Sequence, residues 1–255
     1  MENGPALSIR NISKSFVTKK TDLNVVNHVS LDVYRNEFLV LLGPGQCGKS
    51  VILNMLAGLE KPTVGEIYLN GKPHSGIDKR IAMVFQKLAL LPWLTVSKNV
   101  QLGLKYSNIP QKEREEISAK FIKLVGLSGF ENHYPHQLSG GMKQRVGIAR
   151  AYANSPEVLL MDEPFGQLDA QTRYSMHDEI LKIWEQERRT IVFVTNNIEE
   201  ALYLADRIVL FSKQPATVKA EFDLSKLGRP RSYTSDEFLR MREELTELME
   251  LDIKR

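Results

Sequence analysis

The sequence predicts an α/β fold with a mostly parallel sheet at its core, and three apolar runs carry this prediction. The run at residues 38–42 leads into a glycine-rich turn and then into further apolar residues, the pattern of a strand, a tight loop and a helix start. Residues 158–161 and 191–195 are also apolar, as expected of strands buried inside such a sheet. A chain of 255 residues is long enough for one large domain of this kind, with or without a small appendage.

The N-terminal part alternates apolar and polar residues at 7–12 and at 29–33, which predicts two half-buried strands. Phe16 lies in the polar segment between them. Its ring either packs in the core or stacks on an adenine ring, and the residues alone favour the core. After the glycine-rich turn, residues 65–72 predict a strand that ends in an Asn-Gly turn.

The middle of the chain begins with a short predicted strand at residues 81–85, which ends at Gln86. That side chain meets either solvent or a metal ion bound at the strand end. Residues 88–96 form an apolar loop that is either domain core or a docking surface. The periodicity of residues 111–126 predicts an amphipathic helix. Residues 138–142 open another helix, with a start that is either an ordinary N-cap or a cradle for phosphate.

The C-terminal third begins with a predicted helix. Its apolar face is formed by Met176, Ile180, Ile183 and Trp184. Residues 199–205 predict another helix, and residues 208–211 are expected to be the last strand. The composition then changes, with a linker at 228–231. Residues 234–237 have the spacing of a capping box and begin an amphipathic tail helix, which packs on the domain or on a twin subunit.

Composition and charge argue against several classes of protein. The 34 Lys and Arg residues nearly balance the 31 Asp and Glu residues, which gives no electrostatic reason to expect nucleic acid as a partner. The single cysteine, Cys47, excludes an intrachain disulfide and fits a reducing compartment. The N-terminus lacks the features of a signal peptide, and no stretch approaches the roughly 18 apolar residues of a membrane span. We therefore expect any connection to a membrane to go through a partner.

The glycine-rich turn at residues 43–50, here called the phosphate-binding loop, has the spacing G-x-x-x-x-G-K-S. Between a strand and a helix, the backbone N–H groups of such a loop converge on phosphate oxygens. Lys49 is then expected to reach the β- and γ-phosphates of a nucleotide, and Ser50 to hold Mg²⁺. Gln46 has a Cβ, so a positive φ at this position is expected to strain the loop.

Asp162 and Glu163 follow the apolar run at 158–161, at the strand end where open α/β sheets bind ligands. Seen alone, the two carboxylates fit a solvated turn. Coupled to the phosphate-binding loop, they predict that Asp162 holds Mg²⁺ together with Ser50, and that Glu163 orients and polarises the attacking water.

Taken together, these motifs closely resemble the ATP-binding subunit of an ABC transporter, over residues 7–211. The resemblance rests on the phosphate-binding loop, on Gln86, on Leu-Ser-Gly-Gly-Met-Lys-Gln-Arg at 138–145 and on Leu-Leu-Met-Asp-Glu-Pro at 159–164. Leu-Ser-Gly-Gly before a helix is specific to this family, and it favours a phosphate contact for residues 138–142, here called the signature segment. Residues 90–96 resemble importers of the nitrate, sulfonate, taurine and bicarbonate group.

The resemblance implies a P-loop NTPase fold of the ABC ATPase type, with an antiparallel β subdomain and a helical subdomain beside the parallel core. It implies a nucleotide-binding domain over residues 1–212, with the helical subdomain at about 88–155, and a short linker and helix over 213–255. The activity implied is ATP hydrolysis coupled to transport across a membrane.

The site implied by the resemblance binds ATP with Mg²⁺, and in it Phe16 stacks on adenine. Catalytic roles fall to Glu163, Gln86 and Asn196, and metal-binding roles to Ser50, Gln86 and Asp162. The implied nucleotide-contacting residues are Phe16, Gly43, Pro44, Gly45, Gln46, Cys47, Gly48, Lys49, Ser50, Val51, Ser139, Gly140, Gly141 and Asp169.

The resemblance also implies several protein partners. One is a second ABC ATPase subunit, identical or a paralogue, which completes each ATP site with its signature segment. Two membrane-spanning permease subunits are expected to dock near Gln86 and residues 90–94, and a solute-binding protein to serve the same system. The implied location is peripheral, on the cytoplasmic face of the membrane.

Three residues depart from the family pattern. Asn196 stands where the family usually has a histidine that meets the γ-phosphate, and Gln46 and Gln167 stand where smaller residues are usual. Asparagine donates a hydrogen bond but carries no charge and is shorter than histidine. Two interpretations stay open: a catalytically weakened, regulatory subunit in a heteromeric pair, or a homodimer that tolerates Asn196.

Overall fold

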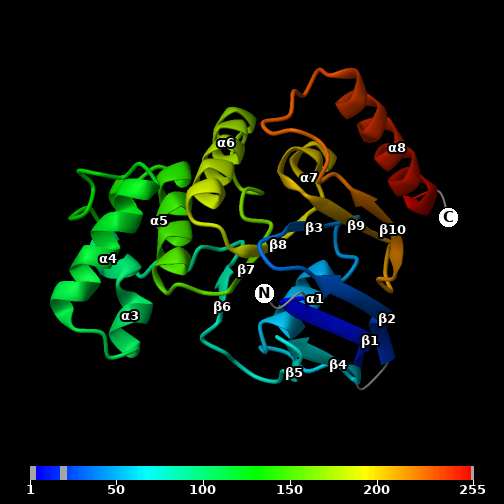
Figure 1. Cartoon of the computed structure of the whole chain (residues 1–255), viewed down its shortest axis with the longest axis horizontal. Helices are drawn as coiled ribbons and strands as arrows, with labels where there is room; N and C mark the ends of the chain where they lie inside the picture. The colour runs from blue at the N-terminus through cyan, green and yellow to red at the C-terminus, as the bar shows by residue number, and fades with distance from the viewer. Residues whose placement is uncertain (1–3, 18–21, 254–255) are drawn as a thin grey trace. The chain divides into compact units, whose positions relative to one another are not determined.

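The computed structural model describes residues 4–17 and 22–253, and they divide into two compact units (Figure 1). The first unit contains the residues up to 78 and those from 189 onward, and the second contains residues 79–188. The domain boundaries expected at 88, 155 and 213 stay predictions.

The first unit contains an antiparallel sheet with the order β2-β1-β4-β5. Its strands are β1 (Leu7–Val17), β2 (Asp22–Val33), β4 (Val64–Leu69) and β5 (Lys72–Pro73). The two N-terminal strands are longer than the predicted stretches at 7–12 and 29–33. Three shifts of register between Ile9 and Ile12, Ile12 and Lys14, and Lys14 and Ser15 interrupt the pairing of β1 with β2. Such shifts break the two-residue alternation on which the prediction depended.

A second set of paired strands in this unit has the order β10-β9-β3-β8. Its members are β3 (Phe38–Leu42), β8 (Thr190–Thr195), β9 (Arg207–Phe211) and β10 (Val218–Asp223). β3 is parallel to both β8 and β9, and every residue of β3 and β8 is buried, as the apolar runs predicted. The expectation that β9 is the last strand was wrong. β10 pairs antiparallel with β9 at the sheet edge, where a half-exposed strand needs no continuous apolar run.

Three helices complete the first unit: α1 (Lys49–Leu56), α7 (Ile198–Leu204) and α8 (Asp236–Ile253). α1 contacts both β2 and β8, so it lies between the two sheets. α7 packs on β3 and β8, and α8 packs on α7 (Figure 1). The cap of α8 is one residue later than the predicted capping box. Ser235 accepts from the backbone N–H of Phe238 at 3.3 Å, in the place expected for Thr234.

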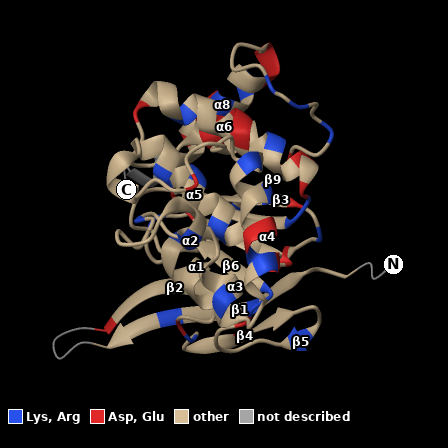
Figure 2. Cartoon of the chain, turned by 90° about the vertical axis from the view of Figure 1, so that its left-hand side faces the viewer, with Lys and Arg blue, Asp and Glu red and all other residues tan. Residues whose placement is uncertain are grey.

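The second unit joins a pair of parallel strands, β6 (Ile81–Val84) and β7 (Val158–Asp162), to a helical region. The helices are α2 (Val96–Val100), α3 (Leu102–Tyr106), α4 (Gln111–Leu124), the 3₁₀ turn η1 (Pro135–Gln137), α5 (Gly140–Ala153) and α6 (Ala170–Gln186). α4 packs on α5, with the rings of Phe121 and Tyr152 6.2 Å apart. Figure 2 shows basic and acidic positions side by side on α4.

The predicted class is confirmed. Parallel, buried strands occur in both units, an antiparallel sheet accompanies them in the first unit, and a helical region follows β6 in the second. Among the helices described here, none combines the length and the apolar character that crossing a membrane requires.

Candidate active site

The phosphate-binding loop begins where β3 ends and closes at Gly48, the N-cap of α1. Gly48 has a φ of 119°, and a Cβ added there would lie 2.9 Å from the carbonyl oxygen of Val25. Only glycine therefore fits this position without moving the neighbouring strand. Gln46 is exposed and has a φ of 62°, so the strained conformation anticipated from its Cβ is present.

Lys49 is the most informative residue of the loop, because its long cationic side chain is only 3% exposed. Its ammonium group donates to the carbonyl oxygens of Gly43 at 2.8 Å and Pro44 at 2.7 Å. Sγ of the buried Cys47 lies 3.6 Å away. Carbonyl oxygens orient the ammonium group without neutralising it, so the loop holds a positive charge among its backbone groups. This is the charge and shape that an anionic phosphate requires.

Ser50 is exposed in the first turn of α1, and Val51 follows it half-buried. A serine hydroxyl is a suitable ligand for Mg²⁺, which usually takes one or two protein oxygens together with substrate phosphates and water. Among the described residues, no group of three or more His, Cys, Asp or Glu side chains is arranged to hold a metal ion. The Ser50 hydroxyl fits Mg²⁺ that arrives together with a nucleotide.

The carboxylate pair lies in the second unit, at the end of β7. Glu163 has a φ of 40°, a left-handed conformation that is uncommon for a residue with a side chain. Nε2 of Gln86, which follows β6, donates to Oε2 of Glu163 at 3.5 Å. The parallel pairing of β6 and β7 explains this approach, because it brings the carboxyl ends of both strands to the same edge. Asp162 is the last residue of β7 and is half-buried.

The signature segment leads into α5, and Ser139 is the N-cap of that helix. Its hydroxyl accepts from the backbone N–H of Met142 at 3.3 Å, so the capping interpretation is part of the structure. Ser139 and Gly140 are nevertheless exposed, while Gly141 is buried. A phosphate contact from this segment stays a prediction.

Asp169 is a helix cap and Phe16 is exposed, and neither position was indicated by the residues alone. Asp169 caps α6 by accepting from N and Oγ1 of Thr172 at 3.0 and 2.7 Å, and these hydrogen bonds lower the pKa of its carboxyl group. Phe16 is 36% exposed near the end of β1, with Nζ of Lys14 4.9 Å from its ring centroid. The core interpretation of Phe16 was wrong, because its ring is exposed. Stacking on adenine stays a prediction.

Asn196 and Asn197 follow the end of β8 and differ in their surroundings. Asn197 caps α7, since its Oδ1 accepts from the backbone N–H of Glu200 at 3.0 Å. Asn196 is exposed. The two asparagines were not distinguished from the sequence, although Asn197, three residues before Glu200, has the spacing of a capping signal. Gln167 is also exposed.

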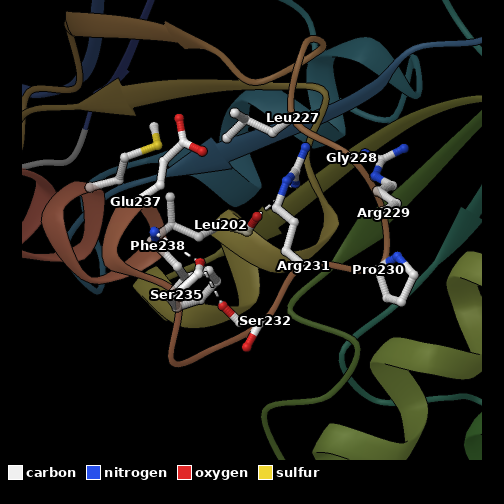
Figure 3. Close-up of a pocket in the computed structure, with 11 residues that line it drawn as sticks. Leu202, Leu227, Gly228, Arg229, Pro230, Arg231, Ser232, Ser235, Glu237 and Phe238 are labelled. Carbon is white, nitrogen blue, oxygen red and sulfur yellow. Dashed lines mark hydrogen bonds between the residues drawn. The ribbon is translucent and has the colours of Figure 1, made fainter.

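A cavity of about 270 Å³ lies away from the phosphate-binding loop, between α7, the linker after β10 and the start of α8 (Figure 3). Beside it, the buried guanidinium of Arg231 donates to the carbonyl oxygens of Leu202 at 2.7 Å, Ala205 at 2.8 Å and Leu224 at 3.0 Å. Burial lowers the pKa of Arg231 to about 10, so the side chain stays charged at neutral pH. Arg231 thus anchors the linker to the end of α7, a role the linker composition did not indicate.

Replacing Arg231 with alanine is expected to lower the free energy of unfolding by about 2 kcal/mol, because buried carbonyl oxygens lose charged donors. Urea unfolding followed by circular dichroism measures the change. Arg240→Ala, at an exposed position of α8, is the matched control and is expected to change little. Equal stabilities of the two variants would contradict the anchoring role.

Comparison with known proteins agrees with this geometry. The model of the ABC transporter family matches residues 26–166. An uncharacterized ABC transporter ATP-binding protein of Methanocaldococcus jannaschii is 47% identical, over 97% of this chain and 92% of its own length. The nitrate import ATP-binding protein NrtD of Synechocystis is 38% identical, over 95% of this chain and 94% of its own. The aliphatic sulfonates import ATP-binding protein SsuB of Bacillus cereus is 39% identical, over 96% of each.

A solved structure shares the fold as well. It is a dimeric ATP-binding cassette in a post-hydrolysis state, bound to ADP and Pi, with a TM-score of 0.74 and 33% sequence identity. The match covers 86% of this chain and 98% of the cassette. The chain therefore belongs to the ABC transporter family, as an ATP-binding subunit that resembles the nitrate and sulfonate importers.

Proposed function

We propose that this chain binds and hydrolyses ATP to power the uptake of a small solute, nitrate-, sulfonate- or taurine-like, through membrane-spanning partner subunits. The observation that carries the proposal is the Lys49 ammonium group, held inside the phosphate-binding loop by two carbonyl oxygens and ready to meet phosphate. The relatives named for nitrate and aliphatic sulfonate import support the solute class.

In this proposal each site residue has a distinct task. Loop amides and Lys49 bind the β- and γ-phosphates, and Phe16 stacks on adenine. Ser50, Asp162 and Gln86 provide oxygen ligands for Mg²⁺, which when bound supplies divalent charge to polarise the phosphoryl oxygens. Glu163 accepts a hydrogen bond from the attacking water, and the Gln86 amide, 3.5 Å from its Oε2, helps to orient that carboxylate.

A second ATPase subunit completes the site in this proposal. The exposed Ser139 and Gly140 contact the nucleotide held by the twin, so ATP closes the pair and hydrolysis reopens it. The dimeric state of the related cassette supports this arrangement. The twin is either a second copy of this chain or a paralogue.

The membrane partners are proposed to dock on the loop after Gln86. Trp93, on this loop, is 69% exposed, and Phe85, just before Gln86, is 40% exposed. An indole ring is a common anchor of protein interfaces, because it buries a large area with few rotatable bonds. We place the chain on the cytoplasmic face of the membrane, held there by two permease subunits, with a solute-binding protein in the same system.

Asn196 sets the rate in this proposal. If a histidine here stabilises the transition state as one oxyanion donor typically does, its absence costs roughly 3 kcal/mol, or about a hundredfold in rate. The site on this chain is therefore proposed to bind ATP and hydrolyse it slowly. The names of the relatives support a transport ATPase and do not support a purely regulatory subunit.

The test is ATP turnover of the purified transporter with Asn196→His, beside the unmodified protein, with subunit stoichiometry determined on the same sample. A rise of about tenfold or more is expected, because the variant gains an imidazole that can carry charge beside the γ-phosphate. Asn196→Gln is the matched control for length: it keeps an uncharged amide donor and adds length, so without the charge it is expected to leave the rate unchanged.

Two outcomes would contradict this account. Unchanged turnover in Asn196→His with a paralogous ATPase in the complex would assign turnover to the partner's site. Unchanged turnover in a homodimer would show that position 196 does not limit the rate.

A further inference from the structure

The loop that exposes Trp93 is held in one shape by a buried side chain. Asn99 lies on α2 and is 0% exposed. Its Oδ1 accepts from the backbone N–H of Leu91 at 2.9 Å. Its Nδ2 lies 3.2 Å from the carbonyl oxygen of Leu91, 3.0 Å from that of Leu94 and 3.1 Å from that of Thr95. One amide thus holds both ends of the turn whose tip carries Pro92 and Trp93.

The amide of Asn99 has more acceptor neighbours than its two N–H donors require. A primary amide has two N–H donors, and here three carbonyl oxygens compete for them. Two of those oxygens, on Leu91 and Leu94, flank the turn and lie outside the helix that carries Asn99. Losing the amide would remove the partner of the Leu91 N–H and of the Leu94 carbonyl oxygen, while the Leu91 carbonyl oxygen still accepts from the N–H of Leu94 at 3.1 Å.

A second side chain holds the start of the same loop. Nη1 of Arg150 donates to the carbonyl oxygen of Ala89 at 2.8 Å, and Nη2 donates to that of Leu88 at 2.6 Å. Ala89 has a φ of 45°, so the charged hydrogen bond helps to retain an unfavourable backbone conformation. Arg150 lies on α5, the helix that begins at the signature segment.

We propose that Asn99 and Arg150 are positioning residues that fix the loop at 88–95, so that Trp93 meets the membrane partner in a ready-made orientation and the loop moves together with α5. This inference rests on the proposed function. Ordering the turn before association removes an entropy cost that the interface would otherwise carry. Arg150 links the docking loop, at one end of α5, to the segment proposed to contact the twin's nucleotide at the other end.

The rigidity of the loop is tested first on the isolated full chain. Chymotrypsin cleaves after exposed aromatic residues, so the Trp93–Leu94 bond reports opening of the turn when fragments are identified by mass spectrometry. Asn99→Ala is expected to speed cleavage at this bond by about tenfold or more, because local opening governs the rate. Gln101→Ala is the matched control. Gln101 follows α2, and its Nε2 donates to Oγ of Ser97 at 2.8 Å, not to the loop.

A milder variant covers the case in which Asn99→Ala fails to fold. Arg150→Lys keeps the charge but has a single ammonium group in place of a planar fork, so it is expected to release one of the two carbonyl oxygens. Cleavage after Trp93 should rise several-fold, with an unchanged unfolding midpoint. Wild-type cleavage rates in folded Asn99→Ala, or in Arg150→Lys, would overturn the positioning role while leaving the proposed function untouched.

Docking is tested second, in the purified transporter reconstituted into lipid vesicles. Asn99→Ala is expected to lower the number of solute molecules moved per ATP hydrolysed at least fivefold, while ATP binding stays normal. A loosened turn with unchanged coupling would overturn the docking role of the loop. If the unmodified chain neither binds nor hydrolyses ATP, the proposed function fails, and the cleavage assay still reports on the turn.

Discussion

ATP turnover of the Lys49→Ala variant is expected to fall by about a thousandfold, close to the background of the assay. The substitution removes the one cationic group that the structure places inside the phosphate-binding loop, where it is held by Gly43 and Pro44. A preorganised charge at developing negative charge is commonly worth a factor of 10² to 10³, roughly 3–4 kcal/mol. Phosphate release from the purified transporter measures the effect, with a fluorescent ATP analogue to follow binding.

The control for this experiment is Lys72→Ala, which removes an exposed lysine from β5 of the same unit. It is expected to turn over ATP at the normal rate. Circular dichroism must show that Lys49→Ala is folded, since the variant also removes two hydrogen bonds from the loop. Normal turnover in folded Lys49→Ala would remove this loop from the active site.

Glu163→Gln is expected to bind ATP normally and to hydrolyse it about a thousandfold more slowly. The amide keeps the size and the polar contacts of the carboxylate but accepts a proton poorly, and general-base catalysis is typically worth 10² to 10⁴. Because ATP then persists, the variant should accumulate as a closed pair of subunits. Size-exclusion chromatography with bound nucleotide measured in the dimer peak tests this expectation.

Glu157→Gln is the matched control, an exposed glutamate just before β7, at the opposite end of the strand from Glu163. It should neither slow turnover nor accumulate a dimer. A Glu163→Gln variant that hydrolyses ATP at the normal rate would assign the base to another residue. Slow hydrolysis without a dimer would instead contradict the closure of the pair by ATP.

The buried strands of this fold were predictable, because their length and flanking residues decide between a strand and a buried helix. The run Phe38–Leu42 is apolar at every position, is only 5 residues long and leads into a glycine turn, which favours a buried strand. β10 was not predictable in the same way. Its first three residues are all half-buried, and charged side chains are mixed with the apolar ones, so it resembles a polar connection.

Residues of the candidate site were predictable where a motif has both a known chemistry and a fixed spacing. They were less predictable where the role depends on contacts with distant parts of the chain. The glycine at 48 was indicated by the motif, and its necessity became clear only from the carbonyl oxygen of Val25 on a strand far along the chain. Phe16 illustrates the limit, since an isolated aromatic residue carries no information on whether a second layer covers it. The hydrogen bonds of Asn99 to the turn could not be predicted for a similar reason. A single buried asparagine leaves no repeating pattern in the sequence.

The pairing of Asn196 with Asn197 has a consequence for how this subunit can change. Asn197 secures the start of α7, while the exposed Asn196 lies outside that helix. Under the proposed role of Asn196, catalytic rate and the start of α7 depend on adjacent positions with separate contacts. A substitution at position 196 is then expected to change the rate of hydrolysis and to leave the cap of α7 in place.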